Sequence, residues 1–237
     1  MMLGDREHQV DKTRQAPQKD SSFEMQCRKC GECCKNGGPA LHLEDLVLIT
    51  SGKLAVSDLI TIRKGELVHN PVSGKIQPAA VELVKIVGSG KQWQCCYYDN
   101  EQGCTIYHYR PLGCRLLKCW DTADILGLVE KDTVGRLDIV TDNAPLIALI
   151  TDHEELCPCA GLHSIMDEKG SLTQEQKKEL ETRVRNDLQF RKKVLEDFGF
   201  SLREELFYFG RPFFQLLQPL GVKVVESESG IQLIWDA

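Results

Sequence analysis

The sequence contains eleven cysteines in 237 residues, and their spacing gives the chain a clear capacity for chemistry. Four of them lie within eight residues, in the stretch QCRKCGECCK: Cys27, Cys30, Cys33 and Cys34. Thiols this close together occur in disulfide-bonded scaffolds, in redox or nucleophilic sites, and in metal sites. Other properties of the sequence discriminate among these three.

Disulfide bonds fit the sequence poorly. The first 22 residues contain no apolar segment of the kind that a secretory signal needs, so we expect a reducing, cytoplasmic location. The number of cysteines is odd, and the adjacent pairs Cys33 with Cys34 and Cys95 with Cys96 would need strained vicinal bridges. Dense cysteines in such a chain indicate metal binding or catalysis, and we favour metal binding over scattered structural thiols.

The spacing of the first four cysteines discriminates between kinds of metal site. Structural zinc commonly uses two separate C-x2-C pairs, each of which supplies two ligands. A C-x2-C-x2-C run supplies three thiolates from one loop and needs a distant fourth, as around cubane iron–sulfur clusters. The bacterial ferredoxin run would place its next cysteine where Gly37 stands, so the chain is not such a ferredoxin. Because Cys33 and Cys34 are adjacent, they could point to two different centres.

Composition and charge limit the partners that we expect. A hydrophobic content of 42% and a charged content of 27% are ordinary for a soluble globular protein. A formal net charge of -6 indicates no nucleic-acid partner and no anionic membrane surface, and no apolar run has the length of a membrane span. We therefore expect no nucleic acid and no membrane among the partners, and a protein partner that the sequence does not identify.

The sequence predicts three parts. Residues 1–22 are polar and nearly devoid of large apolar side chains, which predicts a disordered tail. Residues 23–165 contain every cysteine and form the predicted metal-binding domain. Residues 166–237 contain none and form a predicted helical C-terminal segment that ends in a β-hairpin. The predicted fold class is α+β, an irregular cysteine-rich domain of short helices and β-hairpins with a helical extension.

Local signals place some of the cysteines on individual elements. Residues 41–66 have apolar positions at helical spacing, interrupted by a Ser-Gly pair, which predicts two short helices. Residues 81–99 predict a hairpin around a Gly-Ser-Gly turn, with Cys95 and Cys96 on its second arm. Pro111 favours a short helix that carries Cys114.

Further helices are predicted towards the C-terminus. Residues 142–157 predict a capped amphipathic helix that ends at Cys157. Residues 173–198 open with a Thr-x-x-Gln capping box and predict a long helix. The aromatic-rich stretch from residue 203 predicts helix to about Gln218, and residues 222–237 predict the closing hairpin.

Several of these residues together resemble a known pattern. It consists of CRKCGECC at 27–34, LED at 43–45, Cys96, CTIYHYRPLGCR at 104–115, CAGL at 159–162, and Leu172 with Thr173. On these residues the chain, from about 24 to 180, resembles the CxxCxxCC family, also called YkgJ-type cysteine-cluster proteins, which are described as zinc- or iron-chelating domains. The chain departs from that pattern in having Cys119 before Trp120 and Ala160 at a position where proline is frequent.

The resemblance implies eight metal ligands: Cys27, Cys30, Cys33, Cys34, Cys96, Cys104, Cys114 and Cys159. Cys95, Cys119 and Cys157 are then additional thiols. Helix geometry agrees for Cys119, because residues five apart on a helix are turned by about 140° and Cys119 should not share a face with Cys114. A buried metal thiolate carries net negative charge, so Arg110 and Arg115 are predicted to compensate it, with surface ion pairs as the alternative.

Two functions compete at this point. The first is an iron–sulfur protein, possessing one or two centres, that acts in redox chemistry or in a protein-modification system. The second is a zinc-stabilised protein-interaction module without redox activity. No hydrolytic motif stands out, and His108 and His153 are more typical of structural histidines than of ligands where so many thiols are present. Whether the protein is an enzyme is left open.

Overall fold

The structure, a computed structural model, describes residues 27, 29–90, 93–162, 164, 172–218, 221–227 and 230–235. The tail predicted for residues 1–22 lies outside these described residues. Helices and small antiparallel strand pairs are both present, which confirms the predicted α+β class. None of the helices in the described part of the chain combines the length and the hydropathy that a bilayer crossing needs.

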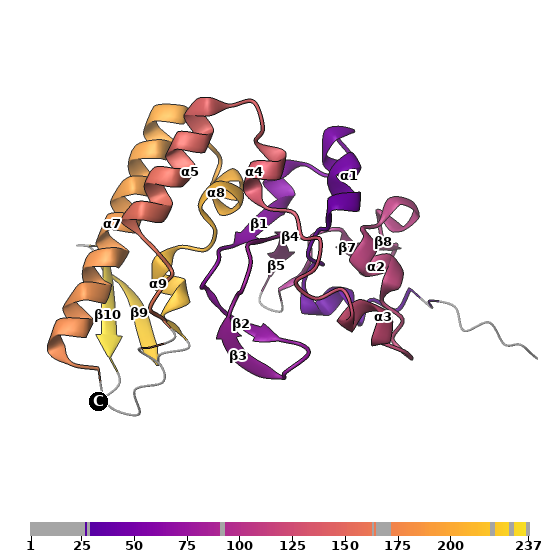
Figure 1. Ribbon diagram of the computed structural model, residues 1–237, viewed down its shortest axis with the longest axis horizontal. Coiled ribbons are helices and arrows are strands. Elements are labelled where there is room, and N and C mark those ends of the chain that lie inside the picture. Colours follow the sequence, from indigo (N-terminus) through magenta and orange to yellow (C-terminus); the bar gives the residue numbers. More distant parts are fainter. Residues whose placement is uncertain are drawn as a thin grey trace, which may run out of the picture.

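The helices are mostly short in the N-terminal half and longer after residue 143 (Figure 1). The α-helices are α1 (Leu46–Thr50), α2 (Leu112–Leu116), α3 (Ala123–Leu126), α4 (Arg136–Ile139), α5 (Ala144–Leu156), α7 (Gln174–Phe198), α8 (Leu202–Phe209) and α9 (Phe213–Leu216). Single 3-10 turns form η1 (Cys34–Asn36), η2 (Leu43–Asp45), η3 (Val56–Asp58) and η4 (Tyr107–Tyr109).

The strands are short and pair two by two. They are β1 (Leu59–Ile62), β2 (Leu67–Asn70), β3 (Lys75–Pro78), β4 (Leu83–Ile86), β5 (Gly88–Ser89), β6 (Gln94–Cys95), β7 (Tyr98–Asp99), β8 (Gly103–Cys104), β9 (Val222–Ser227) and β10 (Gly230–Trp235). The antiparallel pairs are β1 with β4, β2 with β3, β5 with β6, β7 with β8, and β9 with β10. The cysteine-bearing strands β6 and β8 are two residues long, so turns and side-chain packing must hold them in place.

The predicted capped helices are confirmed. Helix α5 begins after Asn143, whose side chain accepts a hydrogen bond from Leu146 N, and ends at Leu156, directly before Cys157. Helix α7 begins after Thr173, and the predicted capping box with Gln176 is present. These side chains satisfy N–H groups that have no partner inside the helix, which explains why both starts were predictable.

Two helix predictions are wrong in part. The second helix expected within residues 41–66 is replaced by η3 and β1, because β1 pairs along its whole length with β4, which a local pattern cannot reveal. The helix expected to run to Gln218 is broken into α8 and α9. Gly210 has a left-handed backbone with φ of 68°, and Pro212 precedes the first residue of α9.

Buried apolar side chains form two clusters. The first is built mainly from the N-terminal half and includes Leu41, Leu59, Val84, Ile86, Val134 and Phe207. The second includes Leu67, Cys157, Cys159, Leu162, Leu180, Val184, Phe213 and Leu216. Each cluster draws residues from both sides of the boundary predicted at 165, since Phe207 lies in the first and Cys157 in the second. The division into 23–165 and 166–237 stays a prediction.

Helix α8 connects the cysteine-rich N-terminal half of the chain to the C-terminal helices. It packs against β1 and η3, while α5 and α7 lie side by side and the β9–β10 hairpin lies next to α7 (Figure 1). The Thr61 hydroxyl donates a hydrogen bond to Phe207 O at 2.5 Å. Buried Arg136 in α4 pairs with Glu82 at 2.5 Å and Glu154 at 2.7 Å, and it also donates to Tyr208 O. Buried ionic groups thus fix the C-terminal helices onto the cysteine-rich half.

Candidate metal centre

Five thiols from four segments gather in the cysteine-rich half. They are Cys33 and Cys34 at η1, Cys95 in β6, Cys104 in β8 and Cys114 in α2. Burial raises the pKa of Cys104 and of Cys114, and negative charge on Cys33 and Cys95 raises both further. The same neighbours act on Cys34, whose Sγ lies 4.0 Å from that of Cys33. Cys33, Cys34, Cys95 and Cys114 line one cavity, and Cys34, Cys95 and Cys104 belong to the same apolar cluster. These five residues therefore form one group, which we call the thiol cluster.

A glycine allows the first cysteine loop to reach the cluster. Gly31 has φ of 80°, and a Cβ built on it would lie 2.1 Å from the Tyr98 ring, so no other residue fits without rearrangement. The Tyr98 hydroxyl also donates to Cys30 O at 3.4 Å. The first cysteine loop is therefore packed directly onto β7. The chain turns after β7 and continues into β8, which carries Cys104.

A buried aspartate positions the helix that carries Cys114. Asp45 is 1% exposed; its Oδ2 accepts from His42 N and its Oδ1 accepts from Leu112 N at 2.8 Å. Leu112 is the first residue of α2, so Asp45 fixes the start of this short helix. Sequence reasoning included Asp45 in the family pattern but missed this role. The only sequence signal for Asp45 was its place in the LED triplet. Its role was not predictable because its partner, Leu112, lies 67 residues further along the chain.

Two of the clustered thiols are prepared for ionisation. A hydrogen bond from Cys34 lowers the pKa of Cys33 to about 6, and a hydrogen bond from Cys96 lowers the pKa of Cys95 to about 7. In each adjacent pair one thiol gives up its proton while the other keeps it. The thiolate is the form that binds a metal. A set of thiolates without other strong donors suits zinc or iron, so the residues present fit the predicted centre.

Arg110 lies where the prediction requires a compensating cation. Its positive charge lowers the pKa of Cys33 and opposes the upward shifts of Cys104 and Cys114. The guanidinium lies 3.9 Å from the centre of the Tyr107 ring and donates to Tyr107 O at 3.2 Å, which holds it in place.

Arg115 is placed differently from Arg110. Its guanidinium forms an ion pair with Glu44, and both side chains are about half exposed. This is the surface ion pair that the sequence left open as the alternative. Arg110 is therefore the cation that we assign to the thiol cluster.

The structure distinguishes the adjacent cysteines Cys95 and Cys96. Cys95 is buried, and charge on Cys33 acts on it; Cys96 is half-buried, and its other charged neighbours are Asp58 and Arg203. Strand geometry turns neighbouring residues to opposite sides, so only one of the two can face the cluster directly. The predicted ligand was Cys96, and its role stays a prediction. The geometry favours Cys95.

We expect serine at position 95 to reduce bound metal more than serine at position 96. Cys95→Ser removes a buried sulfur of the cluster, whereas Cys96→Ser replaces the thiol beside it with a hydroxyl that can still donate a hydrogen bond. Metal per chain, measured by mass spectrometry on both purified variants, checks this. If Cys95→Ser binds as much metal as the wild-type protein and Cys96→Ser loses its metal, the sequence-based assignment of Cys96 as the ligand is correct.

The other cysteines of the first half lie at the edge of the cluster or outside it. Cys27 and Cys30 are exposed on the loop that precedes η1 and stay predicted ligands. Cys119 is exposed beyond the end of α2, and its exclusion from the predicted ligand set stays a prediction.

Cys159 lies apart from the other predicted ligands. It is buried in the second apolar cluster, and burial raises its pKa to about 12. The charged groups that act on it are Arg63, Glu66, Glu154 and Asp187, not the thiols of the cluster. We therefore leave Cys159 out of the candidate centre. Its predicted role as a ligand is tested by the metal content of Cys159→Ser.

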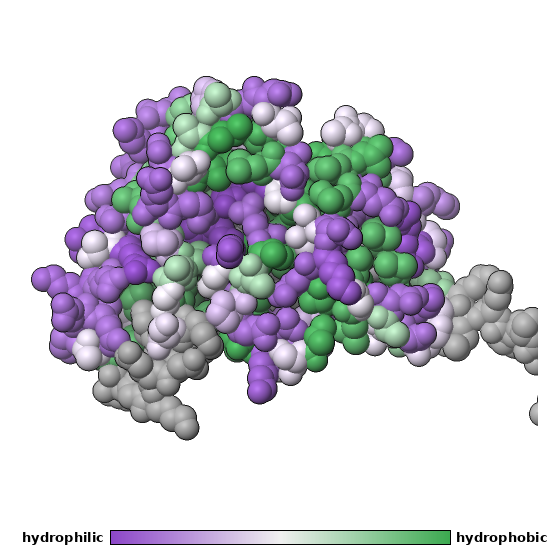
Figure 2. All heavy atoms as spheres, viewed as in Figure 1, coloured by the Kyte–Doolittle hydropathy of each residue, from purple (hydrophilic) through white to green (hydrophobic). Residues whose placement is uncertain are grey.

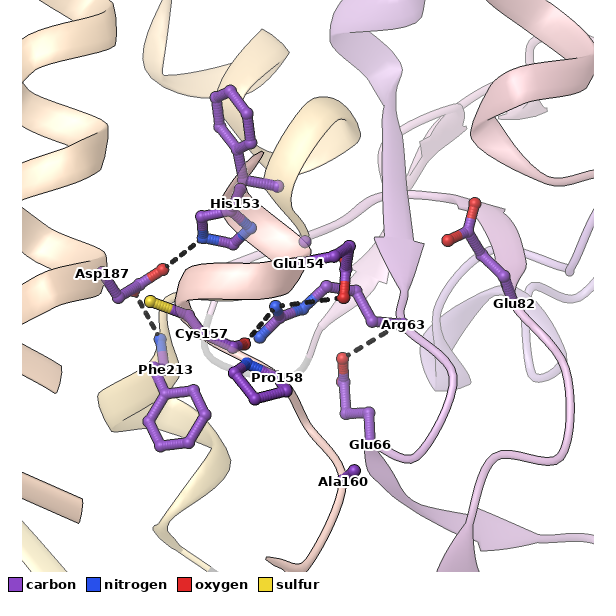
Figure 3. Close-up of polar contacts among 12 residues, drawn as sticks. Arg63, Glu66, Glu82, His153, Glu154, Cys157, Pro158, Ala160, Asp187 and Phe213 are labelled. Atoms are coloured by element: carbon purple, nitrogen blue, oxygen red, sulfur yellow. Dashed lines mark hydrogen bonds and ion pairs between the residues drawn. The ribbon is translucent and has the colours of Figure 1, made fainter. Parts of the chain in front are cut away.

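A second group of possible ligands lies at the junction of α5 and α7. The buried side chains of His153, Cys157 and Asp187 place ligand atoms within 4.8 Å of one another (Figure 3). The Asp187 carboxylate already accepts three hydrogen bonds, from His153 Nε2 at 2.7 Å, Arg191 Nε at 2.9 Å and Phe213 N at 2.8 Å. The carboxylate is thus engaged before any metal arrives.

Nearby positive charge further argues against a cation at this junction. Buried Arg63 donates to Cys157 O at 2.8 Å (Figure 3), and buried Arg191 contacts Asp187 directly. Both guanidinium groups would repel a divalent metal. We therefore interpret His153, Cys157 and Asp187 as a structural network, which agrees with the structural role expected for His153.

Acidification should weaken this network. Burial, together with charge on Arg191 and Arg63, lowers the pKa of His153 despite its bond to Asp187. Burial opposes ionisation of Asp187, but its hydrogen bonds and Arg191 hold its pKa at about 2. Both folded pKa values lie below the unfolded ones, so this stability is present at neutral pH and is lost as pH falls, first below about 6.5 and then below about 4.

We expect the melting temperature of the native protein to fall between pH 7 and pH 5, and the fall to be smaller in His153→Gln. Thermal denaturation followed by circular dichroism, at equal metal content, measures both slopes. Parallel pH profiles for the two proteins would show that His153 does not contribute.

Comparison with known proteins agrees with the resemblance given by the cysteine pattern. Residues 26–136 match the family model CxxCxxCC, described as a "Putative zinc- or iron-chelating domain". The matched segment contains all five residues of the thiol cluster. The match ends before Cys157 and Cys159, which lie in the second apolar cluster. No curated protein and no solved structure matches the chain.

Proposed function

We propose that the thiol cluster holds an iron–sulfur centre and that the protein acts in redox chemistry or in a protein-modification system. The observation that carries the proposal is the convergence of Cys33, Cys34, Cys95, Cys104 and Cys114 around one cavity and one apolar cluster, with the charge of Arg110 acting on them. The thiolates would hold the centre, Arg110 would offset its negative charge, and Asp45 and Gly31 position the segments that carry the ligands. An iron–sulfur cluster supplies one-electron chemistry when bound.

The spacing of the sulfurs supports a cluster over a single ion. Four sulfurs around one tetrahedral zinc, each about 2.3 Å from it, lie about 3.8 Å from one another. In the described part of the chain, no three thiols of the cluster place their sulfurs within 4.8 Å of one another. The group is therefore more open than one zinc ion requires, which suits a larger polynuclear centre.

Zinc is the second candidate, and one contact favours it. The 4.0 Å between the sulfurs of Cys33 and Cys34 is close to the separation expected at a zinc ion. Under this alternative the protein is a zinc-stabilised interaction module without redox activity. A cytoplasmic location and a protein partner belong to both versions of the proposal, and a net charge of -6 supports a partner other than nucleic acid.

The metal itself tests the proposal. Protein purified without oxygen is expected to be brown, to absorb broadly near about 400 nm, and to contain iron and acid-labile sulfide in similar amounts. Reduction with dithionite should bleach the absorption. Colourless protein with zinc and no sulfide would establish the alternative.

A further inference from the structure

The two faces of the β1–β4 ribbon have different surroundings. One face carries Leu59, Val84 and Ile86 into the first apolar cluster. The opposite face carries Ile60, Ile62, Leu83 and Lys85, and all four line a cavity of about 680 Å³. The cross-strand register pairs Ile60 with Lys85 and Ile62 with Leu83, so the four side chains form one continuous surface. A volume of this size lies in the range of small-molecule sites.

The cavity extends to the candidate metal centre. Its wall includes the thiol-bearing residues Cys33, Cys34, Cys95 and Cys114. Other parts of the wall come from the β2–β3 hairpin and from the α2–α3 region, and Figure 2 shows hydrophobic residues (green) at the surface between these elements. A molecule bound against the ribbon would therefore lie in the same space as the thiols.

Lys85 is a cation on this mostly apolar surface that no carboxylate contacts directly among the described residues. Within the described residues its Nζ has no hydrogen bond and no ion pair. The other cation on the wall, Arg211, donates to the buried Glu66 carboxylate at 2.7 Å and is neutralised by it. Glu130 also lines the cavity but does not pair with Lys85. Burial, and then repulsion by Arg211, lowers the pKa of Lys85, and the Glu66 carboxylate, already paired with Arg211, opposes this shift only in part.

We propose that this cavity binds a small amphipathic monoanion, with its carboxylate or comparable oxyanion at Lys85 and its apolar body along Ile60, Ile62 and Leu83. One unbalanced positive charge suits one negative charge, and a charge-assisted hydrogen bond would satisfy the ammonium. The apolar face would be covered by the body of the ligand, which supplies most of the binding energy. The proposal does not depend on which metal the thiol cluster holds.

Head-group specificity tests the proposal on the full-length protein, purified without oxygen and analysed for metal. Decanoate, decanol and decyltrimethylammonium, each below its micelle concentration, are titrated by isothermal calorimetry. We expect saturable binding of one decanoate per chain, at least tenfold weaker binding of decanol, and no binding of the cation. Absence of saturable decanoate binding, or equal affinity for the three head groups, would overturn the proposal.

Matched variants locate the site. Lys85→Met should reduce decanoate affinity at least tenfold, to the level of decanol, whereas Lys75→Met, at an exposed position of β3 outside the cavity wall, should leave it unchanged. Leu83→Trp should fill the cavity and abolish binding, with metal content unaltered. Decanoate affinity that persists in both Lys85→Met and Leu83→Trp would place the binding elsewhere and refute the assignment. If the purified wild-type protein contains no metal, the proposed metal centre is wrong, but the ligand proposal for this cavity still stands or falls by decanoate binding.

Discussion

Removal of the metal under anaerobic, reducing conditions is expected to unfold the cysteine-bearing segments, residues 29–38 and 93–116. Thiolates crowded into one place repel one another, and without a cation they lack partners. These segments have little else to hold them, because η1 contains no buried residue and strands β5 to β8 are two residues long. Structural zinc contributes about 10–16 kcal/mol to the folding of small metal-dependent domains, so the effect should be large.

Hydrogen exchange measures this local unfolding. Amides of the two cysteine-bearing segments should lose at least about a hundredfold of their protection after chelation, while amides of α7 keep theirs. The reason for the contrast is that α7 packs into the second apolar cluster, which contains none of the five clustered thiols. Return of the metal should restore protection. Unchanged exchange in protein whose metal loss has been verified would show that metal and fold are not linked.

Asp187→Ala is expected to be the most destabilising single substitution among the buried charges of α7. It leaves Arg191, His153 and the Phe213 N–H without their carboxylate partner in a buried site. Removal of one partner from a buried ion pair costs about 3–5 kcal/mol, because the remaining charge stays buried. Arg191 keeps its contact to Glu205 at 2.6 Å, which limits but does not replace the loss.

A control on the same helix isolates the effect of burial. Asp197 is exposed near the end of α7, and Asp197→Ala should change stability by no more than about 0.5 kcal/mol. Urea denaturation of both variants at pH 7 gives the two free energies of unfolding. Similar values for the two variants would mean that the network around Asp187 does not stabilise the junction.

The elements that could be predicted from the sequence are those that local residues specify. Asn143 and Thr173 cap α5 and α7 with their own side chains, and Pro111 precedes α2, so the three starts were visible in the pattern. The C-terminal hairpin followed from alternating apolar residues on both arms. Helix α8 and helix α9 were joined in the prediction because the break at Gly210 depends on its close approach to Thr61 O.

The composition of the candidate site was only partly predictable. Strand alternation implied that one of Cys95 and Cys96 faces inward, but which one depends on the pairing of β6 with β5. Cys159 matched a linear pattern, yet the end of α5 carries it into the second apolar cluster. The network around Asp187 gave no sequence signal, because its partner His153 lies 34 residues away.

The most direct test of the central claim is the metal and sulfide content of four single variants purified without oxygen. Cys33→Ser and Cys114→Ser each remove a sulfur from the thiol cluster and should lose most of the metal, because an open coordination position leaves the centre incompletely held. Cys119→Ser and Cys159→Ser change thiols outside the cluster and should keep the wild-type content. Metal retained in Cys114→Ser and lost in Cys159→Ser would contradict the account.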